Sequence, residues 1–234
     1  MKRVNNISIK IVVVVLVLIS KSLTYAQEIN PTYDLQRVHF GFSIIGNYGK
    51  LKYNTAPNFL DVDTLQQINT LSFPGFGVGG IMNVRINKYF DFRTMVNIQF
   101  VERHLQYVFK GGEERIAKIN STYMEIPVQI KHKSKRSHNK RMYWVAGMTY
   151  RYDFASDIDT DRSNTKPIVA LYPGTFSYDI GAGLDLYYEF FKFSPEIRIS
   201  NGLGNSLVPD PFIYASSLSR ISPKLIQFIL HFEG

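Results

Sequence analysis

The chain from Val38 onward alternates apolar and polar residues with a period of two, and this period predicts β-strands that have two different faces. In the first such segment, Phe40, Phe42 and Ile44 alternate with small or polar residues. The same pattern recurs in eight segments: 38–44, 76–87, 90–100, 124–131, 142–152, 176–186, 193–200 and 226–232. The sequence therefore predicts an all-β domain over residues 38–234, preceded by a short periplasmic segment at 27–37.

Two architectures can use strands of this kind. A soluble sandwich or lipocalin-like barrel buries the apolar faces, whereas a membrane barrel turns them toward lipid and keeps polar groups inside. Three features favour the membrane barrel: fixed charges interleaved with glycine on the polar faces, Tyr and Phe at the strand ends, and connections that alternate in length. Short connections are expected at 87–89 and 189–192, and long ones at 47–73, 103–119, 155–174 and 201–223. We predict an eight-stranded antiparallel transmembrane β-barrel of the bacterial outer membrane, with short periplasmic turns and long external loops.

The charged residues on the polar faces are expected to pair inside the barrel. Eight strands enclose an interior that side chains just fill, and an unpaired buried charge is costly. We predict a structural ion-pair network in the lumen formed by Arg85, Arg93, Asp179, Asp185, Glu196 and Arg198. A lumen packed in this way argues against a diffusion pore.

The N-terminus has the pattern of an export signal. A basic start precedes the apolar run 11–19 and a small-residue cleavage site, so we expect residues 1–26 to be removed before Gln27. The run is too short to cross a bilayer as a helix, and an uncleaved anchor or a buried strand is the alternative. Four of the 27 basic residues and none of the acidic ones lie in this segment, which leaves 23 basic against 19 acidic residues. The formal charge of +8 therefore gives no reason to expect a nucleic-acid partner, and the lack of cysteine excludes disulfides and thiolate chemistry.

Several stretches resemble the PorT family of outer-membrane barrels. The resemblance is carried by Phe73–Gly77 through Ile86–Arg93, by Glu125–Lys131, by Lys133–Arg141, and by Tyr143, Ala146, Gly147, Tyr150 and Tyr152–Phe154. It extends over 38–232, with its more specific motifs at 73–154. PorT-like proteins are associated in the Bacteroidetes with the type IX secretion system and, in gliding species, with motility. The resemblance implies a non-enzymatic accessory or assembly component of protein secretion without a cofactor, whose partners are outer-membrane lipid and other secretion components or cargo proteins.

The most strongly charged segment is 131–141, which combines six Lys or Arg residues with two His. The alternation of loop lengths places it on the periplasmic side, where it is predicted to dock an acidic face of a partner protein, with an association that weakens as salt rises. Anionic lipid headgroups are a second possible target, and a solvated turn that holds the barrel in the membrane is the alternative without docking. The residues assigned to docking are Lys131, Lys133, Ser134, Lys135, Arg136, Asn139, Lys140 and Arg141, of which Ser134, Arg136 and Asn139 match the family pattern.

Two other functions and one metal site are alternatives. A small-ligand or adhesion barrel would work through the loops expected at 47–73 and 201–223. A lipid-modifying enzyme needs a nucleophile and a base near the membrane boundary, for which His104 with Glu102 and Ser121 is the candidate, although we predict that the protein is not an enzyme. The aspartates of 153–161 suggest a weak divalent-cation site, but the segment lacks the glycine and the distal glutamate of an EF-hand loop. We therefore predict no bound metal.

Overall fold

The computed structural model describes residues 33–57, 65–156, 163 and 166–234, so the expected signal peptide at 1–26 lies outside the described residues. Within these ranges the chain forms nine strands: β1 (Val38–Thr55), β2 (Leu65–Ser72), β3 (Pro74–Arg85), β4 (Phe90–Phe109), β5 (Glu114–Lys133), β6 (Lys140–Asp153), β7 (Gly174–Tyr187), β8 (Lys192–Gly202) and β9 (Leu218–Glu233). A 3-10 helix, η1 (Tyr33–Leu35), precedes β1, and the short helix α2 (Ile213–Ser216) precedes β9. In the part of the chain that is described, no helix is long and apolar enough to cross a membrane.

Eight of the described strands form a closed antiparallel ring. From β3 to β9 each strand pairs with the next one along the chain, and β1 closes the ring by pairing with both β3 and β9. The β1–β9 closure places Phe42 opposite Phe232. Strand β2 pairs with the far part of β4, where Leu71 lies opposite His104, so it continues the line of β3. The prediction of an eight-stranded antiparallel barrel is confirmed.

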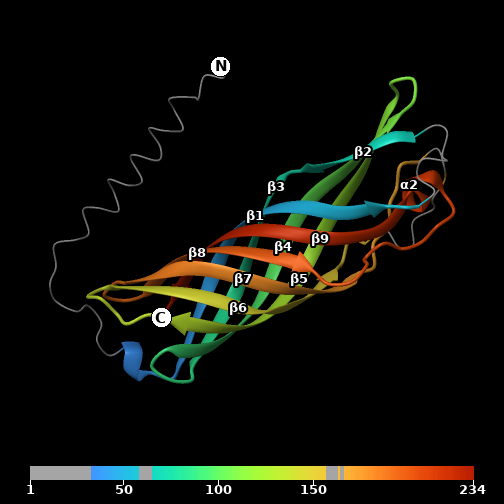
Figure 1. The fold of residues 1–234 in the computed structure, drawn as a ribbon. Coiled ribbons are helices and arrows are strands. Elements are labelled where there is room, and N and C mark those ends of the chain that lie inside the picture. The colour runs from blue at the N-terminus through green and yellow to red at the C-terminus, as the bar shows by residue number, and fades with distance from the viewer. Residues whose placement is uncertain (1–32, 58–64, 157–162, 164–165) are drawn as a thin grey trace, which may run out of the picture.

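The barrel has a short-turn end and an extended end (Figure 1). The connections at 86–89, 134–139 and 188–191 are short, and they lie with η1 and the C-terminus at the short-turn end. Strands β1, β4 and β5 have 18, 20 and 20 residues, about twice the 9–11 residues that a strand needs to cross a bilayer. The β4–β5 hairpin projects at the opposite, extended end.

Two of the four long loops expected from the sequence are largely strand. Strand β1 continues to Thr55, β2 occupies Leu65–Ser72, and only residues 110–113 connect β4 to β5. The expectation of loops at 47–73 and 103–119 was therefore wrong over most of both ranges. The connection between β8 and β9 spans 203–217 and contains α2.

The outward face of the central ring is an apolar belt. Phe40, Phe76 and Trp144 are 64%, 63% and 58% exposed, and comparable apolar side chains recur on every strand of the ring. A soluble protein does not leave so many large apolar side chains in water, whereas lipid covers them at no cost. The predicted assignment of faces, with apolar residues outward and charges inward, is confirmed.

Beyond this belt the two faces exchange their polarity. In β4 the buried inward residues change from Asn97 and Gln99 to Leu105 and Tyr107, while the outward positions change from apolar to polar. The inward apolar residues of the extended end form a core with α2 and with the connection that contains Leu207. This is the pattern of a sheet in water, which buries its apolar face. This exchange of polarity explains why loops were wrongly expected at 47–73 and 103–119. The alternation typical of a membrane strand stops where the strand leaves the bilayer.

Candidate functional site

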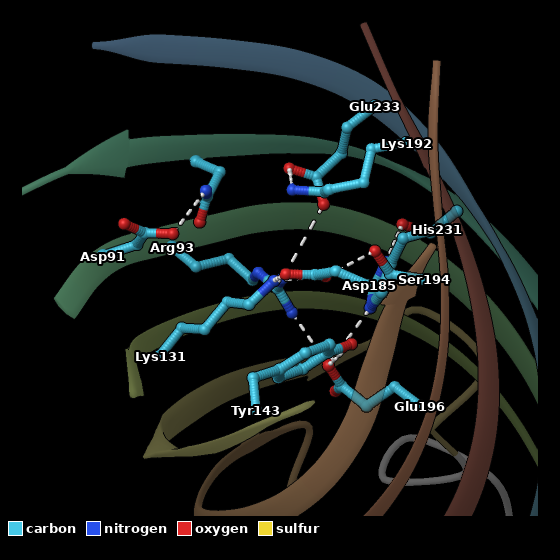
Figure 2. A network of polar contacts seen from close by, with 12 residues as sticks. Asp91, Arg93, Lys131, Tyr143, Asp185, Lys192, Ser194, Glu196, His231 and Glu233 are labelled. Carbon is cyan, nitrogen blue, oxygen red and sulfur yellow. Dashed lines mark hydrogen bonds and ion pairs between the residues drawn. The ribbon is translucent and has the colours of Figure 1, made fainter. Parts of the chain in front are cut away.

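Glu196 of β8 is the centre of a buried polar cluster in the barrel lumen (Figure 2). Its carboxylate accepts hydrogen bonds from the guanidinium groups of Arg93 at 2.8 Å and Arg198 at 2.6 Å. The Tyr143 hydroxyl donates to it at 2.9 Å, and His231 Nε2 lies 3.4 Å away. These side chains come from β4, β6, β8 and β9 and are almost fully buried, so one carboxylate joins four strands and balances two arginines out of contact with solvent.

A second group of buried charges lies next to the first. Lys131 Nζ donates to both carboxylate oxygens of Asp185, at 2.7 and 2.8 Å. Lys192 donates to Glu233 at 2.9 Å, and the other carboxylate oxygen of Glu233 lies 3.7 Å from Arg93 Nη2. Figure 2 shows how the charged ends of these side chains converge from opposite walls of the barrel. Each of these charges has an opposite charge within ion-pair distance, which removes most of the penalty for burying it.

A third polar group fills the lumen closer to the extended end. Arg151 donates to Glu125 and, at 2.5 Å, to the hydroxyl of Ser200. Asp179 accepts hydrogen bonds from neutral groups, among them Ser200 and, at 3.3 Å, the Gln129 amide. The middle of the lumen is thus occupied by hydrogen-bonded side chains.

The structure places five of the six residues predicted for the lumen network inside the barrel. Four of them make ion pairs there: Arg93, Asp185, Glu196 and Arg198. Asp179 is buried with neutral partners, whereas Arg85 lies at the rim of the short-turn end and makes no ion pair with any described residue, because it is the last residue of β3. The sequence reasoning missed Arg151, Lys192 and Glu233. The alternation of Arg151 with its outward tyrosine neighbours could have shown that its side chain faces the lumen. Lys192 and Glu233 stand at strand ends, where the alternation does not show which way a side chain faces.

The lumen is closed at the extended end by the apolar core. Leu105 and Tyr107 point inward from β4 and Ile221 points inward from β9, and all three are buried. The Tyr107 hydroxyl donates to the backbone carbonyl of Tyr214 at 2.7 Å, and the two rings meet edge to face with centroids 5.1 Å apart. These contacts hold α2 over the barrel end.

The segment before β1 covers the short-turn end. Tyr33 stacks on His39 with ring centroids 3.8 Å apart. Asp34 accepts hydrogen bonds from Arg141 Nη2 at 2.8 Å and Nη1 at 3.2 Å, and Arg136 Nη1 lies 3.5 Å from it. Burial by itself would raise the pKa of Asp34, but the adjacent guanidinium of Arg141 outweighs burial and holds this pKa below its ordinary value. The N-terminal segment is therefore tied to the barrel by an ion pair and a ring stack.

The basic segment 131–141 divides into a buried part and an exposed part. Lys131, Lys133 and Arg141 face inward and are 0%, 5% and 8% exposed. They pair with Asp185, Asp91 and Asp34. These three residues are not available to a docking partner, contrary to the prediction, because β5 and β6 extend into the segment and turn alternate side chains toward the lumen.

The remaining docking candidates form the turn between β5 and β6. Ser134, Lys135 and Lys140 are exposed, and Arg136 and Asn139 are half-buried. The Ser134 hydroxyl accepts a hydrogen bond from the Met142 amide at 3.2 Å, and the Arg136 guanidinium lies over the Tyr187 ring at 3.8 Å. The backbone carbonyl of Asn139 accepts a hydrogen bond from the Tyr187 amide at 2.9 Å. The three residues that match the PorT pattern thus shape the turn, and docking by the exposed residues stays a prediction.

The candidate hydrolase residues do not converge. His104 lies on the outward side of β4, where its Nε2 is 2.8 Å from Glu102 Oε1 and its ring meets that of Phe73 at 4.4 Å. Ser121 faces the lumen, where Arg103 donates a hydrogen bond to it. The histidine and the hydroxyl are therefore on opposite sides of the barrel wall.

The acidic segment 153–161 lies mostly outside the described residues, so the weak cation site considered there has no structural counterpart to report. Among the residues that are described, no cluster of three or more His, Cys, Asp or Glu side chains could hold a metal ion.

Three solved structures of outer-membrane proteins are similar to this chain at low sequence identity. OprG from Pseudomonas aeruginosa is 12% identical, with a TM-score of 0.45 and coverage of 84% of this chain and 91% of that one. Neisserial surface protein A is 9% identical, with a TM-score of 0.42 and coverage of 82% and 95%. Ail of Yersinia pestis is 10% identical, with a TM-score of 0.39 and coverage of 85% and 100%. No curated protein sequence matches the chain.

A family model matches residues 25–208, a range that includes β1 to β8. The model describes an outer membrane protein beta-barrel domain, in agreement with the closed ring, the apolar belt and the charged lumen. The predicted location in the outer membrane is confirmed, and by the general rule for such barrels the short-turn end faces the periplasm and the extended end the exterior. The chain belongs to the outer membrane protein beta-barrel domain family.

Proposed function

We propose that this protein is a non-conducting, non-enzymatic barrel that serves protein secretion as an accessory or assembly component and acts through contacts with partner proteins at its periplasmic end. The observation that carries the proposal is the contrast between a filled lumen and a basic periplasmic face. Arg93, Lys131 and Glu196 are at most 1% exposed inside the barrel, whereas Lys135 and Lys140 stand in solvent.

A filled lumen favours a role by contact over a role by transport. Ions or cargo could pass only if the lumen cluster around Glu196 and the external apolar core both opened. Breaking one buried ion pair costs about 3–5 kcal/mol, and the lumen contains several of them. A barrel built in this way supplies surfaces at its two ends.

The resemblance to the PorT family supports the type IX secretion system as the setting. The residues that carry this resemblance include the 133–141 segment, whose Ser134, Arg136 and Asn139 shape the periplasmic turn. In this proposal the turn presents Lys135 and Lys140 to another secretion component or to cargo, and the proteins so contacted carry acidic groups.

Gene deletion in the source organism tests the proposal. Extracellular and cell-retained proteins are compared by proteomics in the deletion strain and in strains complemented with the wild type or with Lys135→Gln/Lys140→Gln. Broad retention of secreted proteins that the wild type reverses, and the double variant reverses poorly, supports the secretion role. An unchanged set of secreted proteins overturns it.

A matched control variant removes two charges at the other end of the barrel. Lys110 and Lys118 are exposed on the external β4–β5 hairpin, and Lys110→Gln/Lys118→Gln makes the same change of charge there. This control should restore secretion fully. Lipid A and phospholipid profiles of these strains, and of a strain complemented with His104→Ala, test the absence of enzymatic activity. A profile that changes on deletion and is restored by the wild type but not by His104→Ala would indicate an enzyme.

A second candidate function, adhesion or small-ligand binding, is favoured by the external extension of the barrel. The long β4–β5 hairpin and α2 share an apolar core outside the membrane belt, which gives a rigid platform above the cell surface. Replacing 106–117 by a two-residue turn would remove this platform. Loss of surface binding with normal secretion would favour this second function.

A further inference from the structure

A pocket of about 350 Å³ opens at the periplasmic mouth between the 86–89 turn, the 134–139 turn and the N-terminal segment. Six of the residues that line it are basic: Arg85, Lys88, Lys133, Lys135, Arg136 and Arg141. Asp34 is the single acidic residue of its lining. The pocket is thus a concave surface with a large excess of positive charge.

Half of this charge has a partner inside the protein. Lys133 Nζ lies 2.5 Å from Asp91, Arg141 binds Asp34 through both terminal nitrogens, and Arg136 Nη1 lies 3.5 Å from Asp34. The side chains of Arg85, Lys88 and Lys135 have no carboxylate partner among the described residues, and Lys88 approaches only the Tyr89 ring, at 5.8 Å. Three cations therefore converge on the pocket without a counter-charge, and an anion entering it would meet all three.

Asp34 shows which kind of anion the pocket accepts. Its two carboxylate oxygens lie 2.8 and 3.2 Å from the two terminal nitrogens of Arg141, which is the paired geometry that a guanidinium offers to a carboxylate. The guanidinium of Arg136 lies over the Tyr187 ring, 3.8 Å from its centroid, and 3.5 Å from Asp34, so a second guanidinium is held beside the first.

The position of the pocket favours a protein over a lipid. Arg85 lies opposite Asp91 in the β3–β4 register, without an ion pair between them, and both positions belong to the inward face, as do Lys133 and Arg141. Lipid headgroups surround the outside of the barrel wall, whereas this pocket is lined by residues of the barrel mouth and by Asp34 of the N-terminal segment. A flexible acidic segment of a periplasmic protein can reach such a site.

We propose that this pocket binds a carboxylate-bearing segment of a partner protein, with Arg85, Lys88 and Lys135 as its counter-charges. Asp34 forms an ion pair with Arg141 beside the bound partner segment, and its negative charge weakens the attraction of the pocket for other anions. The inference rests on the proposed function in taking a protein as the partner, but its test measures binding by the isolated barrel and does not depend on secretion.

The test uses the full mature chain in nanodiscs of a neutral lipid and fluorescein-labelled hexaglutamate as the probe, with binding followed by fluorescence anisotropy. The variant Arg85→Gln/Lys88→Gln/Lys135→Gln removes the three counter-charges. The control Lys50→Gln/Lys110→Gln/Lys118→Gln removes three exposed charges from the external end. We expect binding that weakens as salt rises and that is about tenfold weaker in the pocket variant, with the control close to the wild type.

Asp34→Asn should bind the probe about two- to threefold more tightly, because a negative charge beside the pocket is removed.

Equal affinity of the wild type and the pocket variant would overturn the inference, provided that both show the heat-dependent gel shift of a folded barrel. Nanodiscs that contain phosphatidylglycerol form a second arm. If this lipid abolishes the binding of hexaglutamate, and nanodiscs given the same negative charge by a lipid without phosphate do not, the occupant is a lipid phosphate and the inference is wrong. Normal secretion in the deletion strain with the expected probe binding would refute the proposed function alone, and a secretion defect with no pocket-dependent binding would refute this inference alone.

Discussion

The most informative perturbation of the lumen is Glu196→Gln. This change keeps the size of the side chain and one oxygen acceptor, but it removes the charge that two buried arginines share. Arg93 keeps Glu233 as a second carboxylate at 3.7 Å. Arg198, by contrast, has no other carboxylate within ion-pair distance among the described residues. The variant therefore leaves Arg198 as an uncompensated buried charge.

The expected loss follows from the burial of this group. Removing one member of a buried ion pair costs about 3–5 kcal/mol, and because Arg93 retains a partner we expect the lower end, about 3 kcal/mol of unfolding free energy. The matched control is Glu102→Gln, whose side chain is 48% exposed and pairs with His104 on the outer surface. An exposed pair of this kind contributes about 0–1 kcal/mol.

Urea unfolding of the refolded barrel in lipid vesicles measures both values. Trp144 is the single tryptophan of the chain and lies on the lipid-facing surface, so its fluorescence reports the loss of the membrane-inserted state. A loss for Glu196→Gln no larger than that for Glu102→Gln would refute the reasoning. The double variant Glu196→Gln/Arg198→Met removes the uncompensated charge as well and should recover part of the stability; no recovery would locate the effect elsewhere.

Three further predictions concern the lumen, the N-terminal segment and the external core. The purified protein should show no stable ion conductance in planar bilayers, because buried side chains fill the lumen; steady channels would contradict a filled lumen. Because the pKa of Asp34 is lowered in the folded protein, its contact with Arg141 stabilises the N-terminal segment above the ordinary carboxyl pKa and is lost as pH falls through the lowered value. The protection of residues 33–35 against hydrogen exchange, measured relative to the intrinsic rate at each pH, should therefore persist at neutral pH and be lost only as pH falls through this lowered pKa, whereas Asp34→Asn should lose the protection already at neutral pH. Leu105→Ala should weaken the external core by about 2–5 kcal/mol and expose the β4–β5 hairpin to protease while the heat-dependent gel shift persists; loss of the gel shift would mean that the two parts are not separable.

The membrane part of the fold could be predicted because its signal is local. A strand inside the bilayer must place apolar side chains toward lipid, so Phe40, Phe42 and Ile44 identify the face of β1 without knowledge of any other strand. The inward charges follow from the same alternation. Their pairing does not, because Arg93 and Glu196 are 103 residues apart and meet only when the ring closes.

Tight packing in the lumen is a second property that alternation alone does not reveal. Gly183 faces Tyr143, and a Cβ at this glycine would lie 2.5 Å from the Tyr143 hydroxyl oxygen. Since that hydroxyl donates to Glu196, the glycine makes room for a member of the central cluster. The sequence shows glycines interleaved with charges, but only the structure shows which side chain uses the space.

The basic segment shows why charge in a sequence is an ambiguous guide to a docking site. Lys131 and Lys135 belong to one run of positive charge, yet the first is 0% exposed and paired with Asp185 while the second lines the periplasmic pocket. What separates them is the residue at which β5 ends, Lys133, because every second side chain before that point turns inward. Arg85, the last residue of another strand, β3, is half-buried at the same mouth and lines the pocket together with Lys135. A surface for an acidic partner is therefore assembled by strand ends that meet at the barrel mouth, and a contiguous run of basic residues is neither necessary nor sufficient for it.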